Sequence, residues 1–110
     1  MPEAPADIRV GDAPDRSRFE IQVGGEVAGF SEYRRRPGVI AFIHTLTDPR
    51  FEGQGLASQL VRAALTEARS DGLSVLPFCP FVRAYIAGHT EYLDLVPDDM
   101  RAKFDLPAHA

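Results

Sequence analysis

The stretch VIAFIHTLTDPRFEGQGLASQLVRAAL, residues 39–65, decides the fold, because its hydrophobic pattern changes from one kind of element to another. Residues 39–47 are nearly continuous in apolar and β-branched side chains, which is typical of a strand covered on both faces. Asp48-Pro49 ends that strand, since proline has no amide hydrogen to give a ladder. From Leu56 onward the apolar residues recur at spacings of three and four. The stretch therefore predicts a strand, a glycine loop and an amphipathic helix.

Toward the N-terminus the sequence predicts an antiparallel meander. RFEIQV (18–23) alternates apolar and polar residues as a half-buried strand does, and Gly24-Gly25 favours a tight hairpin. EVAGFSEYR (26–34) supplies the returning strand, and a turn over Arg34 to Gly38 leads into residues 39–47. The first 17 residues are rich in proline, so we expect a weakly ordered segment with a possible edge strand near Ile8.

Toward the C-terminus the helix is expected to end near Asp71-Gly72, and LSVLPF (73–78) reads as a short buried strand. A strand reached through a helix lies parallel to the strand that precedes that helix, so 73–78 should pair with 39–47. A second helix begins near Pro80, which suits a first-turn position. The segment from Glu91 to Val96 predicts a further short turn or helix, followed by a polar tail with Phe104 and Leu106 as docking residues.

These elements predict an α/β (α+β) fold with a mixed sheet. An antiparallel meander is followed by a β-α-β unit with parallel strands and then by a C-terminal helix. We expect one domain over residues 18–97, flanked by an N-terminal segment (1–17) and a C-terminal tail (98–110).

Composition excludes several classes of function. The formal net charge is -4 and the isoelectric point is near 5.3, so no attraction to nucleic acid or to an anionic membrane is expected. No apolar run approaches the roughly 20 residues that span a bilayer, and MPEAPADIRV has no signal-peptide pattern, so we expect a cytoplasmic protein. The single cysteine, Cys79, rules out an intramolecular disulfide and a thiolate-rich zinc site, and no metal is expected.

The glycine loop Arg50-Phe51-Glu52-Gly53-Gln54-Gly55 predicts an anion site. Glycines let the backbone turn tightly, so that amide hydrogens converge on one small volume, and the helix dipole adds positive charge there. A pyrophosphate could be held by main chain from Glu52 to Ala57, with Gln54 and Arg50 adding side-chain contacts. The alternative is that two glycines merely link a strand to a helix. Neither a Rossmann fingerprint nor a P-loop is present.

The order strand, R-x-x-G-x-G, helix and parallel strand resembles the acyl-CoA-binding motif of the GCN5-related N-acetyltransferases. The segments EIQVGGEVAGFSEYR, IHT, FEGQGLASQLVRAAL, VLPFCPFV and YIAGHTEYLDLV look like a minimal subfamily about 100 residues long, and the likeness covers residues 18–96. It implies that acetyl-CoA lies between the two parallel strands. Pantetheine would follow Ile43 to Thr47, and the pyrophosphate would lie on the loop. The cofactor-binding residues would be Thr45, Leu46, Thr47, Arg50, Glu52, Gly53, Gln54, Gly55, Leu56 and Ala57.

The same resemblance implies that His44 and Cys79 form the catalytic pair, although Pro80 departs from the small polar residue that often follows the family's cysteine. A thiol at a strand end and helix start is a plausible nucleophile or acid, and His44 a plausible proton acceptor. Direct transfer and an acetyl-cysteine intermediate both fit. The alternatives are a core cysteine and a structural histidine, and packing is the first interpretation of Tyr85 and Tyr92.

The resemblance predicts an N-acetyltransferase that acts on a primary amine, either a small molecule or an exposed lysine or N-terminus. The alternative is a non-catalytic module that binds CoA or acyl-CoA. The run Arg34 to Arg36 is most simply a solvated turn, though it could meet an acidic acceptor or the 3'-phosphate of CoA. The acceptor and the oligomeric state stay open.

Overall fold

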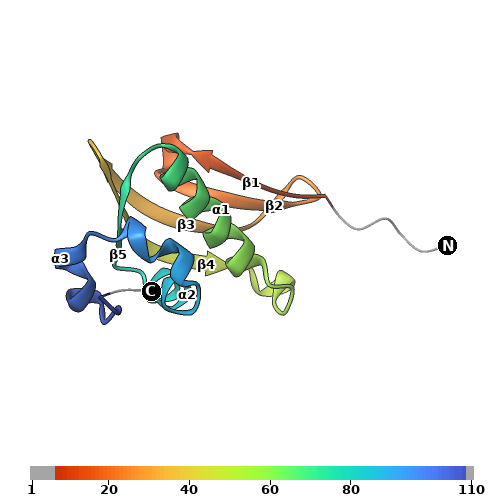
Figure 1. The fold of residues 1–110 in the computed structure, drawn as a ribbon. Helices are drawn as coiled ribbons and strands as arrows, with labels where there is room; N and C mark the ends of the chain where they lie inside the picture. Colours follow the sequence, from red (N-terminus) through yellow and green to blue (C-terminus); the bar gives the residue numbers. More distant parts are fainter. Residues whose placement is uncertain (1–6, 109–110) are drawn as a thin grey trace.

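The computed structural model describes residues 7–108, and a five-stranded sheet in the order β1-β2-β3-β4-β5 forms its base (Figure 1). The first four strands pair antiparallel with their neighbours, whereas β4 and β5 are parallel. The mixed sheet expected from the sequence is therefore confirmed. The strands are β1 (Ile8–Ala13), β2 (Arg18–Val23), β3 (Glu26–Arg36), β4 (Val39–Thr47) and β5 (Ser74–Pro77).

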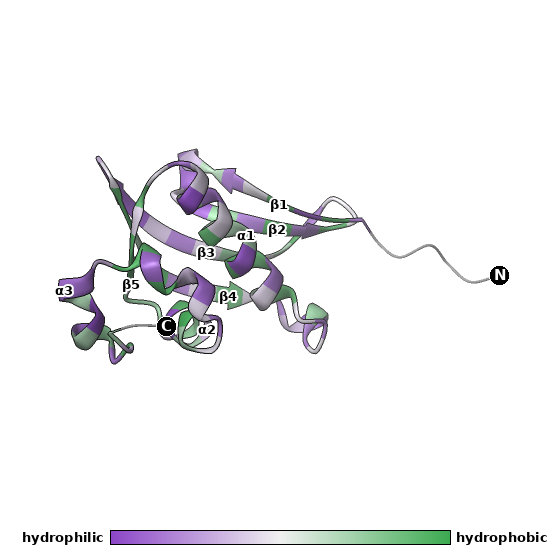
Figure 2. Cartoon of the chain, viewed as in Figure 1, coloured by the Kyte–Doolittle hydropathy of each residue, from purple (hydrophilic) through white to green (hydrophobic). Residues whose placement is uncertain are grey.

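Helices α1 (Leu56–Ser70) and α2 (Pro80–Gly88) lie together over one face of this sheet (Figure 1). Along α1 apolar and polar residues alternate at the helical period (Figure 2), and its six buried residues face the strands. Shorter elements complete the chain: η1 (Pro14–Arg16), η2 (Pro49–Phe51), η3 (Thr90–Leu95), α3 (Asp98–Arg101) and η4 (Ala102–Phe104).

The core is the layer between the sheet and the two helices. Phe42 and Ile40 of β4 meet Leu60 and Leu65 of α1 there, and all four side chains are at most 1% exposed. Val82 and Ile86 extend the same cluster from α2. The opposite face of the sheet has no helix of the described chain over it (Figure 1). That face leaves Leu46 51% exposed and Ile43 36% exposed.

The expectation that residues 39–47 are covered on both faces was therefore wrong. Helices cover the face that carries Ile40 and Phe42, while the C-terminal half of β4 keeps apolar side chains at the surface. A strand with a continuous run of apolar residues is usually buried on both faces, but the run does not show whether a helix is present to cover each face.

Both ends of the described chain contribute to the fold. β1 pairs with β2 along its length, which confirms the edge strand expected near Ile8 and extends the sheet beyond Arg18. Near the C-terminus, Phe104 is 2% exposed and its ring meets that of Phe78 edge-on, at 5.1 Å between centroids. Leu106 is also buried. The rest of the expected N-terminal segment and tail, residues 1–6 and 109–110, lies outside the described residues.

Candidate functional site

The candidate site begins where β5 leaves β4. The two strands pair from Val39 and Ser74 to Phe42 and Pro77, and the amide of Cys79 then donates to the Phe42 carbonyl at 2.8 Å. Beyond this point, within the described chain, residues 43–47 of β4 pair only with β3. One edge of β4 is therefore free at its C-terminal half.

The free edge presents backbone hydrogen-bonding groups. The amide of Asp48 donates to the carbonyl of Ala28 on β3, at 2.7 Å. Because backbone groups alternate in an antiparallel ladder, those of His44 and Leu46 also turn toward β3, whereas those of Thr45 and Thr47 turn toward the gap. The segment can pair with an extended ligand as a strand would.

The glycine loop closes the end of this gap. Gly53 and Gly55 have φ angles of 81° and 70°, which favour glycine, and a Cβ at either position would meet no atom within 4 Å. Their constraint is thus backbone conformation rather than crowding. Gly55 caps α1 without a side-chain hydrogen bond, so the first amides of α1 are free to bind an anion.

A cavity of about 410 Å³ lies between these elements. Its walls come from the end of β4, the loop, the first turn of α1 and the start of α2. The lining residues are Thr45, Thr47, Phe51, Glu52, Gly53, Gly55, Leu56, Ala57, Ser58 and Phe81. The structure thus brings together Thr45, Thr47, Glu52, Gly53, Gly55, Leu56 and Ala57 of the sequence-predicted set.

Three residues of that set do not line the cavity: Leu46, Arg50 and Gln54. Leu46 points to the open face of the sheet, beside Phe30 and Gly29 in a second cavity of about 510 Å³. Its strand neighbours Thr45 and Thr47 point the other way, because successive side chains of a strand alternate.

Arg50 is held by carboxylates instead of facing the cavity. Its Nη2 lies 2.6 Å from Glu26 and 2.9 Å from Asp48, and its guanidinium lies over the ring of Phe51. Hydrogen bonds from Arg50 lower the pKa of Asp48, and bonds to Asp48 and Glu26 raise the pKa of Arg50. In this structure Arg50 thus belongs to an ion-pair network with Glu26 and Asp48, and its contact with a phosphate stays a prediction.

Cys79 lies at the N-terminus of α2 and is 2% exposed. Its thiol donates to Oγ1 of Thr45 at 3.4 Å, and that oxygen lies 3.0 Å from Oγ of the buried Ser31. The thiol is connected to the cavity through Thr45, which lines it.

His44 is on the other face of the sheet from Cys79. It pairs with Glu32, is exposed, and meets the ring of Phe30 edge-on at 6.2 Å. A bulge at Ile43 causes this placement, because Tyr33 pairs with Phe42 and the next residue, Glu32, pairs with His44. The extra residue reverses the alternation of β4. The expected pair is thus not brought together on one side of the sheet.

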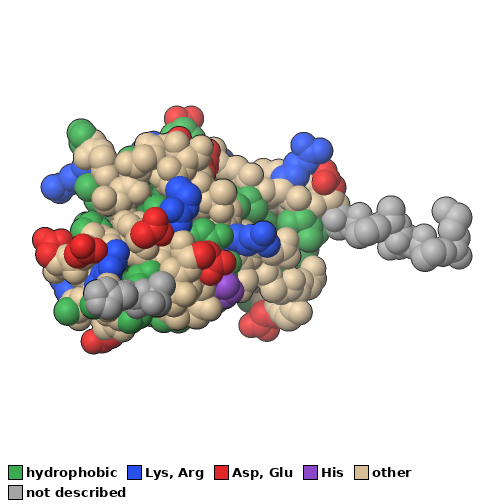
Figure 3. Space-filling model, in the orientation of Figure 1, with side chains coloured by type: hydrophobic (Ala, Val, Ile, Leu, Met, Phe, Trp, Pro, Cys, Tyr) green, Lys and Arg blue, Asp and Glu red, His purple; other side chains and the backbone are tan. Residues whose placement is uncertain are grey.

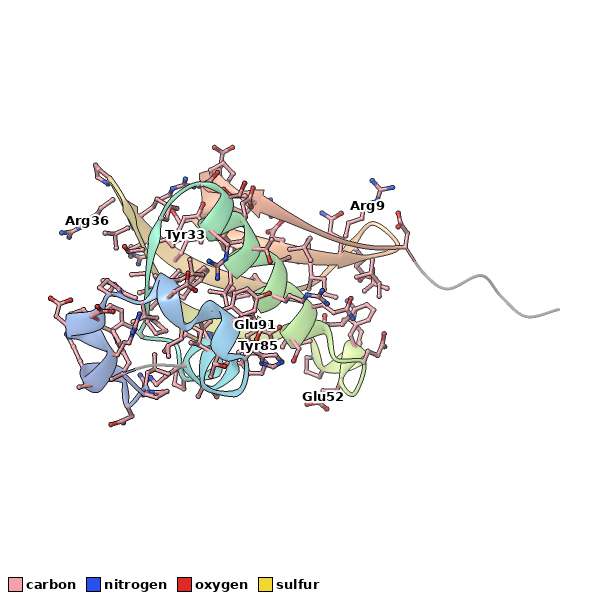
Figure 4. The ribbon with its side chains drawn as sticks, in the orientation of Figure 1. Arg9, Tyr33, Arg36, Glu52, Tyr85 and Glu91 are labelled. Carbon is pink, nitrogen blue, oxygen red and sulfur yellow. The ribbon has the colours of Figure 1, made fainter. Side chains whose placement is uncertain are left out.

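The tyrosines are placed as packing residues. Tyr85 is buried and stacks on His89 at 3.9 Å, and His89 Nδ1 lies 2.8 Å from the Tyr85 carbonyl oxygen. Burial raises the pKa of Tyr85, and the nearby Tyr92 adds to this shift. Figure 4 shows Tyr85 at the helical face near Glu91, and Glu52 at the loop tip.

Sequence reasoning missed Phe51, Ser58 and Phe81 as lining residues. Phe81 is 39% exposed at the first turn of α2, which is an unusual position for a phenylalanine that only fills a core. Apolar residues such as Val82 and Ile86 follow Phe81 in the sequence, so the sequence alone does not distinguish a ring that lines a cavity from one that packs in the core.

No group of three or more metal-ligating side chains gathers within residues 7–108. The described helices also include none with the length and apolarity to cross a bilayer. On the helical face, acidic and basic side chains are interspersed (Figure 3).

Comparison with known proteins places this geometry in context. A family model described as GCN5-related N-acetyl-transferase matches residues 18–95. No curated protein matches the chain. Among solved structures, the chain is similar to a ribosomal-protein-alanine N-acetyltransferase from Brucella melitensis biovar Abortus 2308, with a TM-score of 0.48 and 21% identity. The match covers 73% of this chain and 60% of that one, so this chain spans less than two thirds of that protein.

Proposed function

This chain belongs to the GCN5-related N-acetyltransferase family, and from that premise we propose that it is an acetyl-CoA-dependent N-acetyltransferase that acts on a primary amine. The observation that carries the proposal is the uncapped start of α1 at the mouth of the 410 Å³ cavity, beside the free edge of β4. A cytoplasmic location, expected from the sequence, belongs to the same proposal.

The residues present fit acetyl-CoA. The cavity volume lies within the range of about 300 to 1,000 Å³ that is usual for ligand sites. Gly53 and Gly55 shape the turn, and the amides of Leu56 and Ala57 at the start of α1 would hold the pyrophosphate. Thr45 and Thr47 would hold the pantetheine through their backbone groups. Bound there, acetyl-CoA supplies an acetyl thioester to the acceptor.

Transfer of the acetyl group to the amine forms one bond, breaks another and moves one proton. The acceptor nitrogen forms a bond to the acetyl carbon, the C–S bond breaks, and the proton lost by the amine is matched by one gained at the departing sulfur. In this proposal Cys79 acts on the helical side of β4, where Thr45 orients its thiol, and gives a proton to the leaving group. His44, exposed on the open side, takes the proton of the incoming amine.

A second candidate is a module that binds CoA without catalysis. Two observations favour it: Glu52 is the one charged side chain that lines the cavity among the described residues, and Cys79 is 2% exposed. In that function the loop and the β4 edge would bind CoA, and no side chain would take part in catalysis.

Calorimetric titration with CoA and acetyl-CoA, followed by an assay of CoA thiol release with a panel of amines, tests both. Binding with amine-dependent thiol release supports the enzyme, and binding without release for any amine supports the module. Absence of binding at millimolar CoA would refute both.

A further inference from the structure

A third cavity, of about 340 Å³, lies on the open face of the sheet. It is lined by Arg34, Arg36, Val39, Ala41, Ile43, Leu76 and Phe78. Arg34 pairs across the strands with Ala41, and Arg36 with Val39, so these four side chains share one face. Ile40, which lies between Val39 and Ala41, and Tyr33, which precedes Arg34, are buried in the core on the other face of the sheet.

This cavity and the candidate cofactor cavity meet β4 at neighbouring residues from opposite faces. Ile43, the bulge residue where β5 leaves β4, lines the open-face cavity, while Thr45 lines the cavity under α2. An acetyl group delivered through the gap between β4 and β5 would emerge beside Ile43. An acceptor can therefore reach it from the open face.

The charge of the open-face cavity has one sign. Within the described chain neither Arg34 nor Arg36 forms an ion pair, whereas Arg35 between them reaches Asp71 at 3.3 Å and Asp12 at 3.8 Å. No carboxylate lines this cavity, and Lys103 Nζ lies 5.4 Å from the ring of Phe78 at its border. Arg36 projects outward from the β3–β4 hairpin (Figure 4).

Arg34 Nη1 donates to the carbonyl of Tyr33 at 3.2 Å, which leaves the other nitrogens of its guanidinium for a ligand. Two guanidinium groups without a carboxylate partner in the described chain, over an apolar floor, bind carboxylates well, because the planar fork of arginine donates two parallel hydrogen bonds to both oxygens. Glu32, two residues before Arg34 on β3, has its side chain on the same face of the sheet. It is opposite His44, however, and does not line the cavity. The apolar floor of Val39, Ala41 and Leu76 can contact the apolar middle part of a ligand that has polar groups at both ends.

We propose that the acceptor is a primary amine that carries a carboxylate, with the carboxylate bound by Arg34 and Arg36 and the amine directed to Ile43. This inference rests on the proposed acetyltransferase function and adds the acceptor class to it. Ile43 lies two residue steps along the strand from Ala41, the residue opposite Arg34, which corresponds to about 7 Å. Amines with a carboxylate at about that distance are the matching class.

The test compares 4-(aminomethyl)benzoate with benzylamine, which lacks the carboxylate. Each is titrated calorimetrically into the wild type, the double variant R34A/R36A and the control R9A, with and without CoA. Arg9 is exposed, and its substitution removes one positive charge far from the cavity. Wild type and R9A are expected to bind the carboxylate ligand at least tenfold more tightly than benzylamine, and R34A/R36A to lose that preference.

Equal binding of the two ligands to the wild type, or an unchanged preference in R34A/R36A, would overturn the proposal. So would a loss of affinity for CoA, but not for 3'-dephospho-CoA, in R34A/R36A, because the arginines would then serve the cofactor. Turnover is a separate readout. Carboxylate-selective binding without acetylation of any amine in the panel would support the anion site while refuting the enzyme activity.

Discussion

The thiol of Cys79 and the hydroxyl of Thr45 are hydrogen-bonded at 3.4 Å, and this contact joins the start of α2 to the free edge of β4. Thr45 also meets Oγ of Ser31, so one hydroxyl serves two buried partners and lines the candidate cofactor cavity. A substitution of Thr45 should therefore affect both the stability of the fold and the candidate cofactor cavity.

Replacing Thr45 by valine should destabilise the fold by about 1 to 3 kcal/mol, because the fully buried Ser31 hydroxyl loses its partner within the described chain. Urea unfolding measures the change. The double variant S31A/T45V removes both polar groups and should recover part of the loss. An equally stable T45V would contradict the hydrogen-bond assignment.

Substituting Gly53 by valine should weaken CoA binding at least tenfold in calorimetry, because the loop cannot keep its positive φ with a branched side chain. Gly72 is the matched control: its φ is 69°, but it lies at the other end of α1. G72V should lower stability while leaving CoA affinity unchanged. Equal affinities of G53V and wild type would remove the loop from the site.

The variant Arg50→Ala should change CoA affinity by less than about threefold, since Glu26 and Asp48 already engage the guanidinium. Titration of CoA into R50A measures this directly. A tenfold or larger loss would show that Arg50 leaves its carboxylates to contact the ligand.

His44 and Cys79 should contribute independently to turnover if the chain is the proposed enzyme. They lie on opposite faces of β4 and share no hydrogen-bond partner among residues 7–108, so the effects of H44A and C79S on kcat/KM should multiply to within a factor of about two. The variants T45V and C79S serve as the comparison. Their effects on kcat/KM should not multiply, because the two side chains are in contact. Strong coupling between His44 and Cys79 would mean that they act as one unit.

Alkaline pH should destabilise the protein through Tyr33. Burial, and then a 2.6 Å hydrogen bond to Asp12, raise the pKa of Tyr33 to about 12. The folded state therefore keeps a proton that the unfolded state releases near pH 10, so this contribution is intact below pH 10 and is lost as the pH rises toward 12. The loss should be on the order of 2 kcal/mol.

Denaturant midpoints at pH 8 and pH 11.5 measure that loss, and Y33F should show a smaller decline between them. Tyr85 contributes in the same direction, because its pKa is also raised, so some decline will remain. An identical decline in Y33F and wild type would assign the alkaline transition to other groups.

The order and type of the main elements could be predicted from the sequence because each rests on local chemistry. Alternation marked β2, the glycine pair marked the hairpin before β3, and spacings of three and four marked α1. The parallel pairing of β4 and β5 followed from chain connectivity. The glycine loop was visible for the same reason, since positive φ at Gly53 and Gly55 is a property of those residues themselves.

Other features depended on partners distant in the sequence. Arg50 forms an ion pair with Glu26 of β3, and the residues near Arg50 in the sequence do not predict this partner. The open face of β4 also escaped prediction, because an apolar strand looks the same whether or not a helix covers it.

The sequence by itself determined the succession of strands and helices and the glycine loop where we propose that a phosphate binds, because backbone preference and hydrophobic period act over a few residues. Only the tertiary structure decided which side chains face each other. One extra residue at Ile43 turns His44 away from Cys79, and the alternating pattern of the strand cannot show a bulge that arises from its pairing with β3.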